Sequence, residues 1–183
     1  MDFLKKYGFY LLLAFMVIYF VGRYLYAQPK YINGEIATDF KAPLRDGSPF
    51  QLSQLRGQYV LIDFWGSWCG PCIREMPAIK GLYDKYHNRP FKDAKGFEIV
   101  SVGVETDKAR WENAIQVLGM NWHFNMANFE GMNSPIAKLY GVRVIPTKFL
   151  LNTEGVVVGV NQSMEQIDTF LASKSEWIES TVL

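Results

Sequence analysis

Apolar residues follow two patterns along this chain, unbroken runs and positions spaced three or four residues apart. The runs at 58–65 (QYVLIDFW) and 97–104 (FEIVSVGV) are typical of strands buried in the middle of a sheet. Between them, helical spacing from Cys72 to His87 predicts a helix with one buried face. The remaining patterns predict a hairpin within 40–55, a helix at 106–119, a strand at 121–128, a short helix at 133–141, a hairpin at 142–160 and a helix at 163–171. This order indicates an α/β domain with a partly parallel sheet.

The amino-terminal segment differs from the rest because no charged residue occurs from Tyr7 to Gly22. Lys5 and Lys6 precede the run and Arg23 follows it. With the apolar residues at 24–26, residues 7–26 approach the roughly 20 residues that cross a bilayer. We therefore expect a membrane anchor at 1–27, preferred over a signal peptide because residues 25–27 (LYA) are bulky where cleavage needs small side chains. A buried helix of the domain is a weaker alternative, since the run is apolar all round.

The length of the chain limits the number of domains, and its net charge limits the class of partner. The chain has 183 residues, which is enough for one domain and an appendage, and we divide it into the anchor, a tether at 28–38 and a domain at 39–183. Nineteen Lys and Arg against 18 Asp and Glu leave a net charge of +1, so no nucleic-acid partner is expected. The charges flanking the anchor slightly favour an inside amino terminus and a domain outside the cytoplasm.

The candidate chemistry lies in Cys69-Gly70-Pro71-Cys72, where the first apolar strand ends and the helix begins. Two intervening residues let both sulfurs meet across the first helical turn. Cys69 precedes the helix and sees its free amides and positive dipole end, which favour a thiolate and make it the expected nucleophile. Cys72 lies one turn inside and is expected to resolve a mixed disulfide. The alternatives are an inert disulfide or half of a metal site, although the two histidines, His87 and His123, lack ligand spacing.

The sequence resembles the thioredoxin-fold oxidoreductases, through WGSWCGPC at 65–72, Asp63 before it, Pro77 after it and Ile145-Pro146-Thr147 downstream. The segment from 39 to 65, the added elements between 106 and 128 and the anchor are similar to the TlpA/ResA branch, over about residues 36 to 172. The resemblance implies a thioredoxin-like fold with an amino-terminal hairpin extension and a central helix-strand insertion. It also implies a cis peptide bond at Pro146. The residues expected to contact substrate are Trp68, Gly70, Pro71, Ile145 and Pro146.

Two carboxylates belong to the expected catalytic set. Asp63 lies on a buried strand and matches the thioredoxin acid that passes protons for the deeper cysteine, so we expect its pKa to be raised. Glu75 follows Cys72 by three residues and matches the acid that tunes the cysteines in ResA-like proteins. ResA-like proteins usually have Asn at the position of Asp63, and the lysine that partners the acid in thioredoxin is replaced by Ser101. The two acids could instead be a structural group and a solvated charge.

The sequence thus predicts a membrane-anchored thiol-disulfide oxidoreductase that reduces disulfide-containing client proteins outside the cytoplasm, in cytochrome c maturation or general envelope thiol reduction. The Gly-Pro pair is the one that thioredoxin uses, which favours a reductant. Electrons would come from a membrane thiol donor, with no cofactor and no metal beyond the Cys69–Cys72 pair. One alternative is a peroxiredoxin-like thiol peroxidase, although FWGSWC lacks that class's Pro and Thr. The other is a non-enzymatic metal or cytochrome assembly chaperone, which spaces its cysteines more widely and adds a histidine.

Overall fold

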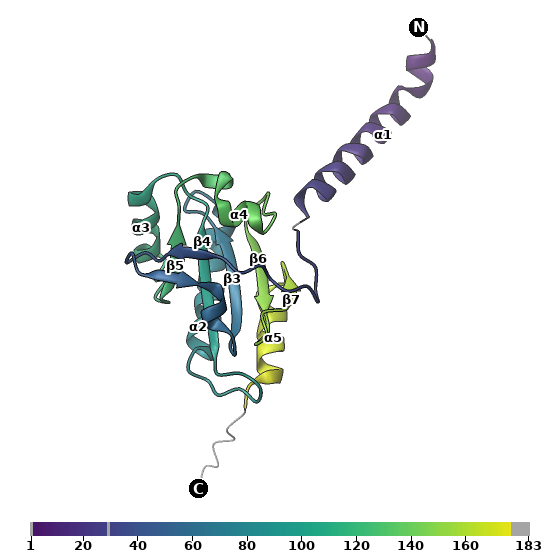
Figure 1. The fold of residues 1–183 in the computed structure, drawn as a ribbon. Helices are drawn as coiled ribbons and strands as arrows, with labels where there is room; N and C mark the ends of the chain where they lie inside the picture. The colour runs from purple at the N-terminus through teal and green to yellow at the C-terminus, as the bar shows by residue number, and fades with distance from the viewer. Residues whose placement is uncertain (1, 29, 177–183) are drawn as a thin grey trace.

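The computed structural model describes residues 2–28 and 30–176, and Figure 1 shows a long helix projecting away from the strands and the other helices. The helix is α1 (Asp2–Ala27), and its stretch Tyr7–Ala27 is long and apolar enough to cross a membrane, with a mean hydropathy of 1.7. None of that stretch is buried against the domain. An apolar helix that nothing in the protein covers is the arrangement expected of a membrane anchor.

A five-stranded sheet forms the centre of the domain, in the order β5-β4-β3-β6-β7. Strands β3 (Tyr59–Trp65), β4 (Phe97–Gly103) and β5 (Phe124–Ala127) pair in parallel. Strand β6 (Thr147–Leu151) pairs antiparallel with β3, and β7 (Val157–Val160) pairs antiparallel with β6. Every residue of β3 is buried, as its unbroken apolar run predicts for a central strand. The predicted α/β class with a partly parallel sheet is confirmed.

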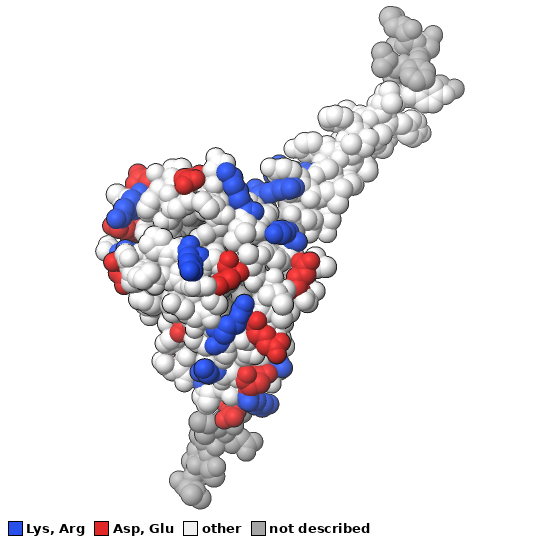
Figure 2. Space-filling view, in the orientation of Figure 1, with Lys and Arg blue, Asp and Glu red and all other residues white. Residues whose placement is uncertain are grey.

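Helices and a hairpin cover the two faces of this sheet. One face packs against α2 (Gly70–Tyr86), α3 (Lys108–Val117) and α5 (Met164–Lys174). The other face packs against the hairpin β1 (Lys41–Pro43) and β2 (Pro49–Gln51), the 3-10 helix η1 (Leu52–Leu55) and α4 (Pro135–Leu139), which follows a second 3-10 helix, η2 (Gly131–Asn133). These elements match the predicted hairpin, helices and strands to within a few residues. On the face shown in Figure 2, charges of both signs are interspersed over the domain.

The segment expected as a tether is attached to the domain through two buried residues, Tyr31 and Ala37, and through backbone hydrogen bonds. Tyr31 is buried among the aromatic rings of Tyr140 and Phe149. Farther along, Gly34 N and Ala37 N donate hydrogen bonds to carbonyl oxygens in the β6–β7 region. This packing could not be predicted from the sequence because the apolar residues of 28–38 follow neither strand nor helix spacing. Only a short link therefore separates α1 from the packed domain.

Candidate active site

The two cysteines lie at the start of α2, shortly after the end of β3. Cys69 is the N-cap of α2, and its Sγ accepts a hydrogen bond from Cys72 N at 3.3 Å. Cys69 and Cys72 form a disulfide, with their Cα atoms 5.3 Å apart. An N–H group of the first helical turn that already points at Cys69 Sγ would stabilise a thiolate there once the disulfide is reduced. The position of Cys69 at the helix start therefore supports its assignment as the nucleophile.

Both cysteines are buried in the disulfide form. Cys69 is 5% exposed and Cys72 2% exposed, and both pack in the apolar cluster that contains Trp65 and Met76. The bonded sulfurs share one environment because a two-residue spacing holds them on the same turn. What distinguishes Cys69 from Cys72 is the helix cap rather than its exposure.

An apolar rim surrounds the disulfide. Trp68 is 52% exposed, and its Nε1 donates a hydrogen bond to Val104 O at 3.0 Å, which fixes the ring over the end of β4. A Cβ on Gly66 would lie 2.9 Å from Trp68 Nε1 and 3.2 Å from Ile145 Cδ1, so glycine is needed for this close approach. The Ile145–Pro146 peptide bond is cis, as the resemblance implies. Gly70 and Pro71 are also exposed, so the rim offers the apolar surface on which an extended segment of a client could dock.

Asp63 lies in the middle of β3 and is 1% exposed, and its Oδ2 atom has no hydrogen-bond partner. Burial raises the pKa of Asp63 to about 7, Lys148 opposes the rise and Glu75 adds to it. The predicted direction is confirmed. A carboxyl group that titrates near neutrality can take up and release a proton during turnover, which is the behaviour required of a general base.

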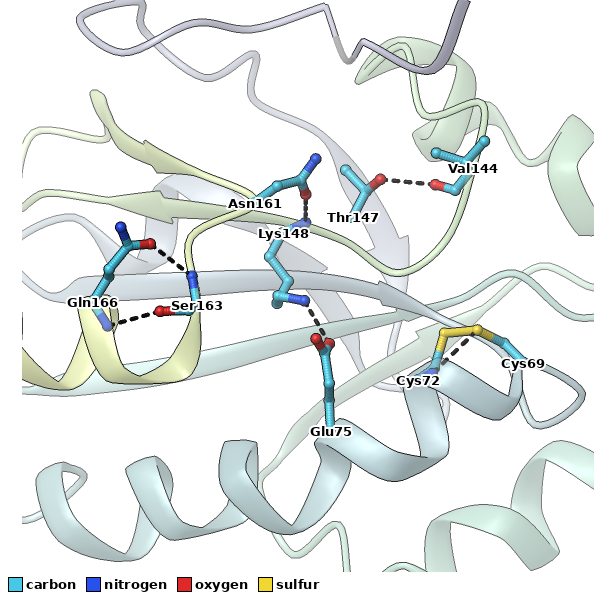
Figure 3. Close-up of polar contacts among 9 residues, drawn as sticks. All are labelled: Cys69, Cys72, Glu75, Val144, Thr147, Lys148, Asn161, Ser163 and Gln166. Atoms are coloured by element: carbon cyan, nitrogen blue, oxygen red, sulfur yellow. Dashed lines mark hydrogen bonds and ion pairs between the residues drawn. A yellow bond between two sulfur atoms is a disulfide. The ribbon is translucent and has the colours of Figure 1, made fainter. Parts of the chain in front are cut away.

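Lys148 is the cation that sequence analysis did not identify. In the sheet, Asp63 is paired with Ser101 on β4, as expected, and with Lys148 on β6. Lys148 Nζ donates a hydrogen bond to Glu75 Oε2 at 2.6 Å, and the side chain points from the sheet toward α2 (Figure 3). The signal available in the sequence was a charged residue inside the apolar strand that follows Ile145-Pro146. Glu75 therefore joins the site through Lys148.

Glu105, two residues after the end of β4, is a second buried acid that sequence analysis missed. It is 1% exposed, and its carboxylate accepts a hydrogen bond from the backbone N–H of Ser67. Ser67 belongs to the loop that leads from β3 to Cys69. The contact ties that loop to β4 and fixes the approach to the nucleophile.

A family model, curated relatives and solved structures all match this chain. Residues 33–160 match the AhpC/TSA family. The thiol-disulfide oxidoreductase ResA of Bacillus thuringiensis (strain Al Hakam) is 33% identical over 141 residues, which cover 75% of this chain and 76% of the relative. ResA of Bacillus subtilis (strain 168) is 30% identical over 154 residues, covering 84% and 80%. A solved thiol-disulfide oxidoreductase from Bacteroides fragilis NCTC 9343 superposes with a TM-score of 0.67 at 28% identity, covering 76% of this chain and 98% of that one.

Proposed function

The chain belongs to the AhpC/TSA family and is a thiol-disulfide oxidoreductase similar to ResA, and from this premise we propose that it reduces disulfide bonds of client proteins outside the cytoplasm. The observation that carries the proposal is the Cys69–Cys72 pair at the start of α2, with Cys69 Sγ accepting a hydrogen bond from the helix. Cytochrome c maturation or general envelope thiol reduction would supply such clients. The pair itself carries the electrons, so the proposal needs no added cofactor.

The reaction has two exchange steps. The thiolate of reduced Cys69 attacks one sulfur of the client disulfide, the client S–S bond breaks, and the released client sulfur takes a proton from water. Cys72 then gives its proton to Asp63 and attacks Cys69 Sγ. The mixed disulfide breaks and the Cys69–Cys72 disulfide forms. The second client sulfur leaves as a thiolate and takes a proton from water, and Asp63 then releases its proton to water. Two electrons have passed to the client, and a dithiol donor must return two to the enzyme.

The rim residues Trp68, Gly70, Pro71, Ile145 and Pro146 are proposed to hold the client segment during the first step. Trp68, Gly70 and Pro71 are exposed, and Ile145 and Pro146 are partly exposed. Pairing of an extended client segment with the backbone next to Pro146 would present the client sulfur to Cys69.

A thiol peroxidase and a metal chaperone are the two alternative functions. Among the residues that the structure describes, no three His, Cys, Asp or Glu side chains are grouped so that they could hold a metal ion. We expect the full chain in detergent, once reduced, to transfer its electrons to a disulfide-bonded test protein much faster than to hydrogen peroxide. We also expect a reduction potential below about −200 mV, on the reductant side of the thioredoxin-fold range. Faster oxidation by peroxide, or a potential near that of the strong oxidases at about −120 mV, would contradict the proposal.

The position of α1 supports a donor in the membrane. Lys30 N donates to Tyr140 O at 3.4 Å, and Arg143 Nη1 donates to Tyr26 O at 3.3 Å. Four residues from Ala27 to the buried Tyr31 span at most about 14 Å. The loop that contains Tyr140 and Arg143 continues directly into Ile145-Pro146, beside the disulfide. Figure 1 shows α1 projecting from the side of the domain where α4 and β6 lie.

Residues 7–26 are therefore proposed to cross the cell membrane once, with the domain on the periplasmic, extracytoplasmic side. In reduced spheroplasts, we expect a polymer-linked, membrane-impermeant maleimide to label Cys69 from outside, and about fivefold faster after a flexible 20-residue Gly/Ser insertion between Ala27 and Gln28. A small impermeant maleimide, the size control, should label both forms at similar rates. Labelling only after lysis would contradict the proposed orientation. Equal labelling rates by the polymer-linked maleimide with and without the insertion would contradict the proposal that the disulfide lies on the membrane-facing side of the domain.

A further inference from the structure

Lys148 is a buried cation placed between two carboxylates. Its side chain is 6% exposed and Glu75 is 40% exposed, so the ion pair runs from the interior toward solvent. On its inner side, Lys148 is the strand partner of Asp63. A buried ammonium group is costly without a partner, and here two anions compete for one cation.

We propose, building on the function above, that Lys148 is a positioning residue that controls how readily Asp63 accepts the proton of Cys72, and that Glu75 acts by drawing the Lys148 ammonium away from Asp63. The two acids then have different tasks. Asp63 accepts the proton of Cys72. Glu75 does not take part in that transfer but sets how close the Lys148 ammonium lies to Asp63.

Strand geometry places the three groups on one face. Opposed residues of antiparallel strands point to the same side of a sheet. Leu61 and Trp65, two positions either side of Asp63, pack in the same cluster as Cys72, as does Leu150, two positions after Lys148. Asp63 and Lys148 therefore both face the underside of α2. Figure 3 shows the ammonium reaching Glu75 just beyond the turn that carries the disulfide.

The backbone of Lys148 is held in place by one neighbouring residue. Lys148 N donates to Asn161 Oδ1 at 2.8 Å, and Asn161 N donates to Lys148 O at 2.9 Å. Asn161 has a φ of 49°, a left-handed conformation that asparagine adopts more readily than most residues. This clamp leaves the long side chain as the part that can shift between the two carboxylates.

The groups facing Asp63 come from three elements. Helix α2 contributes Cys72 and Glu75, and β6 contributes Lys148. Strand β4 contributes Ser101, an uncharged group whose Oγ accepts a hydrogen bond from Trp122 Nε1 at 3.0 Å. Lys148 lowers and Glu75 raises the pKa of Asp63, on top of the larger effect of burial. Removing Lys148 and removing Glu75 should therefore move the titration of Asp63 in opposite directions.

The test follows the resolving step alone, in the full chain in detergent. Cys69 is loaded as a mixed disulfide with 5-thio-2-nitrobenzoate, and attack by Cys72 releases the coloured thiolate. We expect the wild-type rate to rise with pH through a midpoint near 7, where Asp63 becomes able to accept the proton. Lys148→Met should move the midpoint at least one unit upward and slow release about tenfold at pH 6. Glu75→Gln should move it downward and speed release at that pH.

Lys148→Arg is the matched control, because it keeps the positive charge and should restore the wild-type midpoint to within about half a unit. Shifts of the same sign in Lys148→Met and Glu75→Gln, or no shift in either, would overturn the proposal. If Lys148→Met does not fold, Lys148→Met/Glu75→Gln removes the pair together, and its midpoint should lie above that of Glu75→Gln; equal midpoints would overturn the proposal. Wild-type protein that releases no thiolate would contradict the proposed function instead.

Discussion

Cys69→Ser is expected to lower the rate of protein disulfide reduction by at least about a thousandfold, because a serine hydroxyl is not ionised near neutral pH and cannot attack a disulfide sulfur. Cys72→Ser should stop steady-state turnover as well, but for a different reason. Its Cys69 still occupies the helix cap, so the first attack should proceed at close to the wild-type rate.

Single-turnover kinetics separate the two variants. Mixing reduced protein with an excess of a disulfide-bonded test protein should give a rapid loss of one thiol in Cys72→Ser and none in Cys69→Ser. Cys69→Ser/Cys72→Ser provides the background rate. Equal fast phases in both single variants would mean that the capping position does not select the nucleophile.

Asp63→Asn is expected to stabilise the oxidised protein by up to about 4 kcal/mol at pH 8. The folded-state pKa of Asp63 is about 7, above the ordinary pKa of 3.8, so between these two pH values the folded protein holds the proton while the unfolded chain loses it. Stability therefore falls as the pH rises from about 4 to 7, and the full cost of the buried carboxylate is present above pH 7. Asparagine cannot ionise, so the variant avoids this cost.

Urea unfolding of the full chain in detergent at pH 4 and pH 8 measures the effect. The gain from Asp63→Asn should be large at pH 8 and much smaller at pH 4, close to the ordinary pKa of 3.8, where the folded state keeps the proton and little of the cost of ionisation is present. Glu154→Gln, on an exposed turn, removes one negative charge without emptying a buried site and should change stability by less than about 0.5 kcal/mol. A pH-independent gain, or none, would contradict the raised pKa of Asp63.

Most of the fold could be predicted from local sequence patterns because each helix and strand has the residue pattern typical of its type. The apolar run of β3, the helical spacing of α2 and the cap at Asp107, whose side chain accepts from Arg110 N at 3.0 Å, are all properties of neighbouring residues. The disulfide lies within one such local unit. For this reason the core of the site could be found without a structure.

The remaining parts of the site depend on contacts between distant segments. Lys148 meets Asp63 only because β6 enters the sheet beside β3 in a particular register, and a shift by one residue would turn its side chain to the other face. The packing of Tyr31 against Tyr140 is likewise a tertiary contact. The burial of Cys69 follows from the closed disulfide and its neighbours, which the helix-cap argument does not include.

Covalent trapping of clients shows whether Cys69 attacks the disulfides of other proteins in the cell. The full chain carrying Cys72→Ser is expressed in the bacterial envelope, free thiols are blocked with acid and maleimide, and linked proteins are identified by mass spectrometry. We expect thiol-reversible complexes in which Cys69 is joined to a client cysteine, and few or none with Cys69→Ser. Complexes formed through Cys72 in Cys69→Ser, with none through Cys69 in Cys72→Ser, would contradict this expectation.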